Sequence, residues 1–127
     1  MIVFHAADLI WATRIKSAAD ALGIPARPVR SVEMLQARLG DSPVKALIVD
    51  LDAPEVALAL IGHLRGQEAG KAIRVLAFGP HVAVDAFAAA KGAGADAVMA
   101  RGGFAANLPR ILQSLNGSQS VQDQLTE

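Results

Sequence analysis

A carboxylate at the end of an apolar run is the residue best placed for chemistry in this chain. Residues 46–49 form the unbroken apolar run Ala-Leu-Ile-Val, and Asp50 follows them directly. An apolar run without alternation is typical of a strand that is buried on both faces of a parallel sheet. Open α/β sheets place their sites at the carboxyl ends of such strands. We therefore expect Asp50 to lie where a functional site would form.

The residues that follow Asp50 predict the start of a helix. Asp52 can cap it, Pro54 fits its first turn, and Glu55 stands three positions after the cap. Aspartate is favoured at the cap because its side chain accepts a hydrogen bond from an unpaired backbone N–H group. Proline is tolerated in the first turn because the N–H group that it lacks would be unpaired there. We therefore expect Asp52 to cap a helix from about Pro54 to Arg65.

Three further residues are predicted to line the same edge of the sheet: His5, Gly79 and Arg101. They follow the predicted strands Ile2–Phe4, Ile73–Phe78 and Asp96–Ala100. Arg101 carries a charge that could pair with Asp50 through a charge-assisted hydrogen bond. We expect His5 to be a hydrogen-bonded residue at the rim, because no second histidine or acid stands at the spacing of a metal site. The sequence therefore predicts no metal ligands and no cofactor.

Strand-like runs alternate with amphipathic segments five times along the chain, which predicts a parallel sheet with helices on both faces. Pro25 and Pro28 should place the second strand at an edge, because proline cannot donate to a strand ladder. The order 2-1-3-4-5, which is flavodoxin-like, satisfies this pattern. We expect Arg101–Gly103 to be a turn and Leu108–Leu115 to form the last helix. Residues 1–115 would then form one domain, followed by a polar tail over residues 116–127.

The composition excludes several classes of protein. Twelve Lys and Arg balance twelve Asp and Glu, so the net charge gives no reason to expect nucleic acid or an anionic membrane as a partner. The chain contains no cysteine, which excludes disulfides and thiolate chemistry. The N-terminus lacks the features of a signal peptide, and no apolar run approaches the ~20 residues that span a bilayer. We therefore expect a cytoplasmic location.

With these features the chain resembles the receiver domains of response regulators, the CheY-like proteins of two-component signal transduction. The resemblance is carried by Leu47-Ile-Val-Asp50-Leu with Pro54, and by Ala93-Gly-Ala-Asp96 before the last strand. It covers the chain to about Leu115. In receivers the acid that ends the third strand accepts a phosphoryl group from a histidine kinase. The resemblance therefore implies that Asp50 occupies the phospho-acceptor position of a phosphorelay protein.

The other receiver motifs differ in this sequence. Receivers hold Mg²⁺ with a pair of acids after the first strand, where this chain has His5-Ala6. Gly79 replaces the Thr or Ser that ends the fourth strand, and Arg101 replaces the lysine that ends the fifth. Arginine keeps the charge, but as a planar fork rather than a point charge. Asp50 is therefore either a vestigial acceptor or a carboxylate that is kept as the partner of Arg101.

We expect a stand-alone pseudo-receiver that works by binding another protein, such as a signalling protein or a histidine kinase, or a second copy of itself. In receivers such contacts commonly use the fourth helix, fifth strand and fifth helix, which correspond here to Ala83–Lys91, Val98–Arg101 and Phe104–Arg110. One alternative is a genuine phospho-acceptor that uses Asp50. Another is a small-ligand binder in the crevice lined by His5, Asp50, Gly79 and Arg101. An enzyme is not expected, because no nucleophile and base can be paired.

Overall fold

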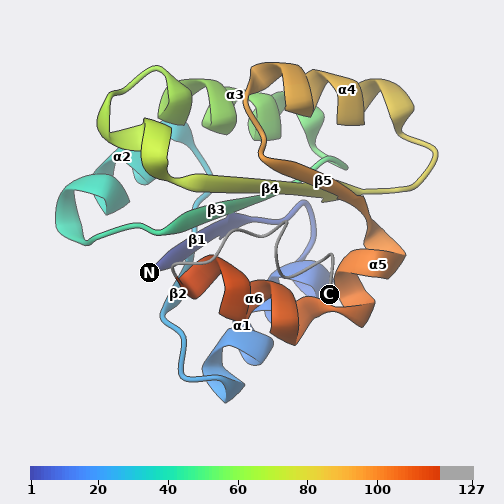
Figure 1. Cartoon of the computed structure of the whole chain (residues 1–127), viewed down its shortest axis with the longest axis horizontal. Helices are drawn as coiled ribbons and strands as arrows, with labels where there is room; N and C mark the ends of the chain where they lie inside the picture. Colours follow the sequence, from blue (N-terminus) through green and yellow to red (C-terminus); the bar gives the residue numbers. More distant parts are fainter. Residues whose placement is uncertain (118–127) are drawn as a thin grey trace.

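A computed structural model gives the structure of residues 1–117, which form a three-layer α/β sandwich (Figure 1). The five strands are all parallel and lie in the order β2-β1-β3-β4-β5, as the sequence predicted. They are β1 (Ile2–His5), β2 (Ala26–Pro28), β3 (Ala46–Asp50), β4 (Arg74–Gly79) and β5 (Ala97–Ala100). Every residue of β3 is buried, which agrees with its unalternated apolar sequence. The carboxyl end of this central strand carries Asp50.

Helices cover both faces of the sheet (Figure 1). One face packs on α1 (Leu9–Ala21), α5 (Arg101–Ala106) and α6 (Leu108–Asn116). The other packs on α2 (Val32–Asp41), α3 (Pro54–Arg65) and α4 (Val84–Ala93). A short 3₁₀ helix, η1 (Ala69–Ala72), joins α3 to β4. No helix within residues 1–117 is long and apolar enough to cross a membrane.

The edge strand β2 shows why its prolines are tolerated. Pro25 accepts a hydrogen bond from the N–H group of Ile2, and the N–H group of Val29 donates to Phe4. The backbone nitrogens of successive strand residues point alternately to the two neighbouring sides of the strand. Because the nitrogen of Val29 points toward β1, that of Pro28 points away from it. We expected the prolines to remove donors from the ladder. Instead, the nitrogen of Pro28 stands on the open edge, where no strand of residues 1–117 would use a donor.

The end of the chain differs from the prediction in two places. Arg101–Gly103, which we predicted as a turn, forms the first residues of α5. The last helical segment is divided, because Asn107 separates α5 from α6 and Pro109 stands in the first turn of α6. The domain boundary that we expected at residue 115 lies inside α6, which continues to Asn116. The rest of the predicted polar tail, residues 118–127, lies outside the described residues.

Arg65 joins three segments at the opposite end of the sheet from Asp50. Its guanidinium group donates to the carbonyl oxygens of Gly70, Ile73 and Gly94 at 2.8, 2.6 and 3.0 Å. It also forms an ion pair with Asp96 at 2.9 Å, and this carboxylate accepts a hydrogen bond from the backbone of β4. We did not predict this role. Planar guanidinium, with five donors, suits such a cluster of acceptors better than lysine would.

Candidate functional site

Asp50 is buried completely, and both oxygens of its carboxylate accept backbone hydrogen bonds. Ala7, in the loop after β1, donates to Oδ2 at 2.9 Å. Asp52, in the loop after β3, donates to Oδ1 at 3.0 Å. A buried carboxylate is stable only when its oxygens are paired, and these two contacts supply the pairing. The carboxylate therefore ties the loop after β1 to the loop after β3.

The guanidinium group of Arg101 lies beside both acids of this edge. Its Nη2 atom is 3.9 Å from Oδ1 of Asp50, within the range of an ion pair. The same atom forms a direct hydrogen bond with the carboxylate of Asp52. The sequence therefore placed Arg101 correctly near Asp50. The closer partner of Arg101, however, is Asp52.

Our prediction that Asp52 caps α3 was wrong. The capping residue is Ala53, and no side chain forms a capping hydrogen bond there. The Asp52 side chain is about a third exposed, at 37%, and points its carboxylate at Arg101. An ion pair with an arginine 49 positions away cannot be read from local spacing, whereas a capping pattern can. The helix-capping pattern therefore led us to assign Asp52 a local role, although it is the second acid of the site.

Trp11 forms the base under the arginine side chains. The guanidinium carbon of Arg101 lies 5.7 Å from the centre of the indole, and that of Arg14 lies 4.6 Å from it. Trp11 itself packs against Phe78 and Phe104, so its position is fixed by the core. Cations over an aromatic face are attracted by the ring quadrupole. The ring therefore helps to hold Arg101 over the ends of the strands.

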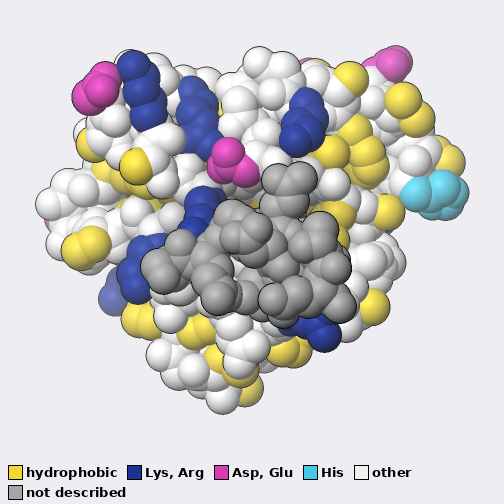
Figure 2. All heavy atoms as spheres, in the orientation of Figure 1, with side chains coloured by type: hydrophobic (Ala, Val, Ile, Leu, Met, Phe, Trp, Pro, Cys, Tyr) yellow, Lys and Arg dark blue, Asp and Glu magenta, His cyan; other side chains and the backbone are white. Residues whose placement is uncertain are grey.

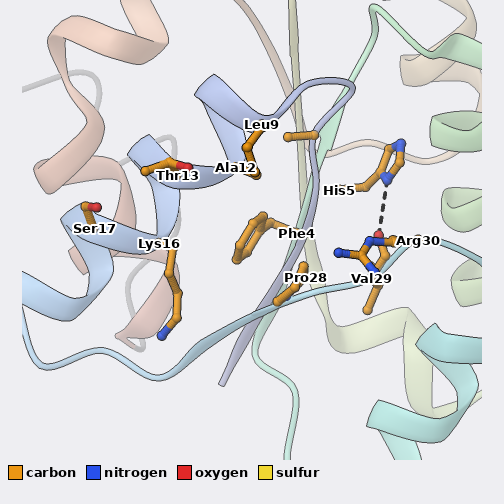
Figure 3. A pocket seen from close by; sticks show the side chains of 11 residues that line it. Phe4, His5, Leu9, Ala12, Thr13, Lys16, Ser17, Pro28, Val29 and Arg30 are labelled. Atoms are coloured by element: carbon orange, nitrogen blue, oxygen red, sulfur yellow. Dashed lines mark hydrogen bonds between the residues drawn. The ribbon is translucent and has the colours of Figure 1, made fainter.

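His5 ends β1 and faces away from these groups. Its Nδ1 atom makes a hydrogen bond of 3.1 Å with the carbonyl oxygen of Val29, so its prediction as a hydrogen-bonded residue holds. The Nε2 atom is buried and has no partner among the described residues. The His5 side chain and that of Phe4 lie on opposite sides of β1 (Figure 3). His5 therefore lies with Val29 beside the ends of β1 and β2, and its ring nitrogens make no hydrogen bond with Asp50 or Arg101.

Gly79 is part of the packing above β3 rather than of an open crevice. It is buried, and a β-carbon at this position would lie 3.0 Å from Cβ of Leu51 and 3.4 Å from Cε1 of Phe87. A side chain at this position would therefore begin against the packed side chains of Leu51 and Phe87. Our prediction that Gly79 lines the crevice with His5, Asp50 and Arg101 is corrected accordingly.

The donors at this edge do not fit magnesium. Mg²⁺ prefers six oxygen ligands in octahedral geometry, and imidazole suits other metals better. Asp50 already accepts two N–H groups, Asp52 holds Arg101, and His5 binds a backbone carbonyl. No cluster of three or more His, Asp or Glu residues that could hold a metal ion occurs within residues 1–117. These side chains are therefore not suited to holding Mg²⁺ at this edge.

The structure resembles several solved receiver domains. The receiver domain of the sensor histidine kinase PA1611 from Pseudomonas aeruginosa PAO1, described with magnesium in its active site cleft, matches with a TM-score of 0.76 at 21% identity, covering 92% of this chain and 97% of that chain. CheY4 of Vibrio cholerae matches with a TM-score of 0.74 at 13% identity, covering 90% of this chain and 96% of that chain. A response regulator from Thermotoga maritima matches with a TM-score of 0.72 at 19% identity, covering 92% of this chain and 98% of that chain.

These similarities show that the chain has the receiver fold. No family model matches the sequence, and no curated protein matches it. Because all three identities are below 25%, they establish the shared fold and leave the activity to be argued from the site. The predicted flavodoxin-like architecture is confirmed.

Proposed function

We propose that this chain is a receiver-fold signalling module that binds another protein and does not carry out magnesium-dependent phosphoryl transfer. The state of Asp50 is the observation that carries this proposal. Its carboxylate is buried, accepts two backbone N–H groups and lies beside a cation that another acid holds. Such a carboxylate stabilises two loops. It is a poor nucleophile, because attack would break contacts that its burial requires.

Positioning and neutralisation of charge account for nearly all catalysis of phosphoryl transfer. Arg101 supplies one positive charge at this edge, and it is shared with Asp52. The hydroxyl that receivers place at the end of the fourth strand is replaced by Gly79. These features favour a binding module over an enzyme, and over the alternative of a genuine phospho-acceptor.

The distribution of exposed apolar side chains supports a protein partner. The large hydrophobic residues that are most exposed within residues 1–117 form two pairs: Leu9 and Ile10 at the start of α1, and Val82 and Val84 beside the start of α4. Because β1 and β4 flank β3, these pairs lie on either side of the Asp50 edge. Figure 2 shows hydrophobic side chains gathered at the right-hand edge, near the end of β4 and the start of α4. Clustered apolar surface of this kind is typical of interaction sites.

Intact-protein mass spectrometry tests the chemical half of the proposal. The protein is incubated with a small phosphodonor and Mg²⁺, and we expect its mass to stay unchanged. A rapid gain of one phosphoryl group that Asp50→Asn abolishes would overturn the proposal and establish a phospho-acceptor. Asp52→Asn serves as the matched control, because it lies at the same edge and leaves Asp50 in place.

A photo-crosslinking experiment tests the binding half. A photoreactive residue is introduced in cells at Ile10 or Val82, and a third variant carries it at the exposed Glu68 beside η1. We expect a discrete crosslinked species, either with another protein or with a second copy of the chain, from the first two positions. Equal crosslinking from Glu68, or none from Ile10 and Val82, would contradict this surface as the point of contact.

A further inference from the structure

A cavity between α1 and β2 stands apart from the Asp50 edge. Its volume is about 350 Å³, within the range of ~300–1,000 Å³ in which proteins hold small molecules. Neither Asp50 nor Arg101 lines it. Figure 3 shows α1 on one side, the β2 segment on the other and Phe4 of β1 between them. Leu9, one of the exposed residues named above, also lines the cavity, so the cavity adjoins that surface. Its other lining residues lie outside that surface, and the cavity requires an explanation of its own.

The sequence of α1 accounts for the cavity. One stripe of the helix, with Trp11, Ile15 and Ala19, is buried in the core. A second stripe, displaced around the helix, presents small or polar residues toward β2: Ala12, Thr13, Lys16 and Ser17. Residues three and four apart share a helix face, so this set forms a continuous wall. Because Ala12 contributes only a methyl group to this wall, space remains between the helix and the strand.

The lining combines an apolar floor with positive charge. Phe4, Ala12 and Pro28 supply apolar surface, whereas Lys16 and Arg30 supply two cations. The lining includes no aspartate and no glutamate, so no carboxylate of the cavity itself balances these charges. The cavity is therefore suited to a ligand with an apolar body and a negative group.

Arg30 is the cation of the lining that has no partner among the described residues. Lys16 already pairs with Asp20 at 2.7 Å, whereas Arg30 has no hydrogen bond or ion pair with any described residue. The hydroxyls of Thr13 and Ser17 likewise have no partner within residues 1–117. A guanidinium group binds a carboxylate through two parallel hydrogen bonds, and hydroxyls can donate to the same group. These side chains form a set of free donors around one apolar floor.

We propose that the α1–β2 cavity binds a small carboxylic acid with an apolar chain. Arg30 pairs with the carboxylate, and Phe4, Ala12 and Pro28 contact the chain. A protein strand added beside β2 is the less favoured occupant, because Pro28 offers no N–H group on the open edge. A small molecule needs only the cavity and its side chains.

Octanoate is the probe for this proposal, with 1-octanol as its neutral counterpart. Amide NMR shifts of the ¹⁵N-labelled chain are followed during titration. We expect saturable shifts confined to β1, α1 and residues 28–30, which line the cavity, with octanoate, and binding at least about threefold weaker with 1-octanol. Arg30→Gln should weaken octanoate binding by a similar factor. Arg27→Gln, at an exposed arginine of β2 outside the lining, should leave it unchanged.

Ala12→Leu should abolish binding by filling the cavity, and its NMR spectrum shows whether the fold is retained. Arg30 is exposed, so the Arg30→Gln test remains decisive even if the Ala12 variant unfolds. Equal binding of octanoate and 1-octanol, or equal effects of Arg27→Gln and Arg30→Gln, would overturn the role of the carboxylate. Shifts that do not saturate, or that map to the Asp50 edge, would overturn the site itself.

Discussion

Asp52, and not Asp50, holds the guanidinium group of Arg101 most closely. Nη2 of Arg101 bonds directly to the Asp52 carboxylate and stands 3.9 Å from Oδ1 of Asp50. The two acids differ in exposure, since Asp50 is fully buried and Asp52 is 37% exposed. Arg101 therefore bridges a buried carboxylate and a solvated one, and this arrangement has consequences for stability.

Removing Arg101 should destabilise the fold modestly. Arg101→Ala leaves Asp50 without its nearby cation but with both backbone donors, so we expect a loss of about 1 kcal/mol in the free energy of unfolding. Urea denaturation provides the measurement. Arg110→Ala, at an exposed arginine of α6, is the control. Equal effects of the two substitutions would show that Arg101 contributes no pairing energy.

Removing Asp50 should cost more. Asp50→Ala leaves the N–H groups of Ala7 and Asp52 without their acceptor, and we expect a loss of about 2–4 kcal/mol. Asp50→Asn keeps one acceptor oxygen and should fall between the wild type and Asp50→Ala. The exposed Asp41 provides the control Asp41→Ala, which should change stability by less than about 0.5 kcal/mol. If Asp50→Asn were less stable than Asp50→Ala in denaturant melts, the role of Asp50 as a hydrogen-bond acceptor would be contradicted.

Two neighbouring glycines should respond in opposite directions to alanine. Gly94 has φ +119°, and a β-carbon there would lie 2.8 Å from Cγ of Arg65, so Gly94→Ala should cost about 1–3 kcal/mol. Gly92 lies in α4 with no atom within 4 Å of such a β-carbon. Gly92→Ala should therefore stabilise the protein by about 0.5–1 kcal/mol. Thermal unfolding of both variants gives the comparison, and a Gly94→Ala variant as stable as the wild type would contradict the cost expected from its φ angle and from the contact with Arg65.

Restoring the receiver hydroxyl at Gly79 should be unfavourable. Gly79→Ser places its β-carbon against Leu51 and Phe87, and we expect a loss of about 1–3 kcal/mol through overpacking. Gly62→Ser is the control, because a β-carbon at that position meets nothing within 4 Å. A Gly79→Ser variant as stable as Gly62→Ser in chemical denaturation would mean that the neighbouring side chains move aside easily.

The fold was predictable because its signals are local. The apolar run at Ala46–Val49 and the prolines of β2 indicated a buried central strand and an edge strand, and both are confirmed. The candidate site was predictable only in part. Parallel strands bring Asp50 and Arg101 to one edge, so their proximity followed from topology. Which acid Arg101 contacts depends on side-chain conformation, which spacing does not determine.

Arg65 illustrates a residue that sequence reasoning missed. Its acceptors are carbonyl oxygens of three separate segments, and carbonyl groups are present at every position of the chain. The available signal was indirect. Gly70 and Gly94 both stand where a β-carbon would collide with a neighbour, which marks close approaches of the backbone. Glycines near a lone arginine at a helix end could therefore have indicated that this arginine bonds to the backbone of several segments.

Because of Pro28, the two margins of the sheet, formed by the edge strands β2 and β5, differ in their capacity to pair with another strand. A margin with free N–H groups can accept another strand, and Ala97 and Met99 of β5 present theirs outward by alternation from Asp96, whose N–H group bonds to β4. The β2 margin offers no such donor at Pro28. A strand from another molecule would therefore pair more readily with the β5 margin than with the β2 margin, where Pro28 removes one donor.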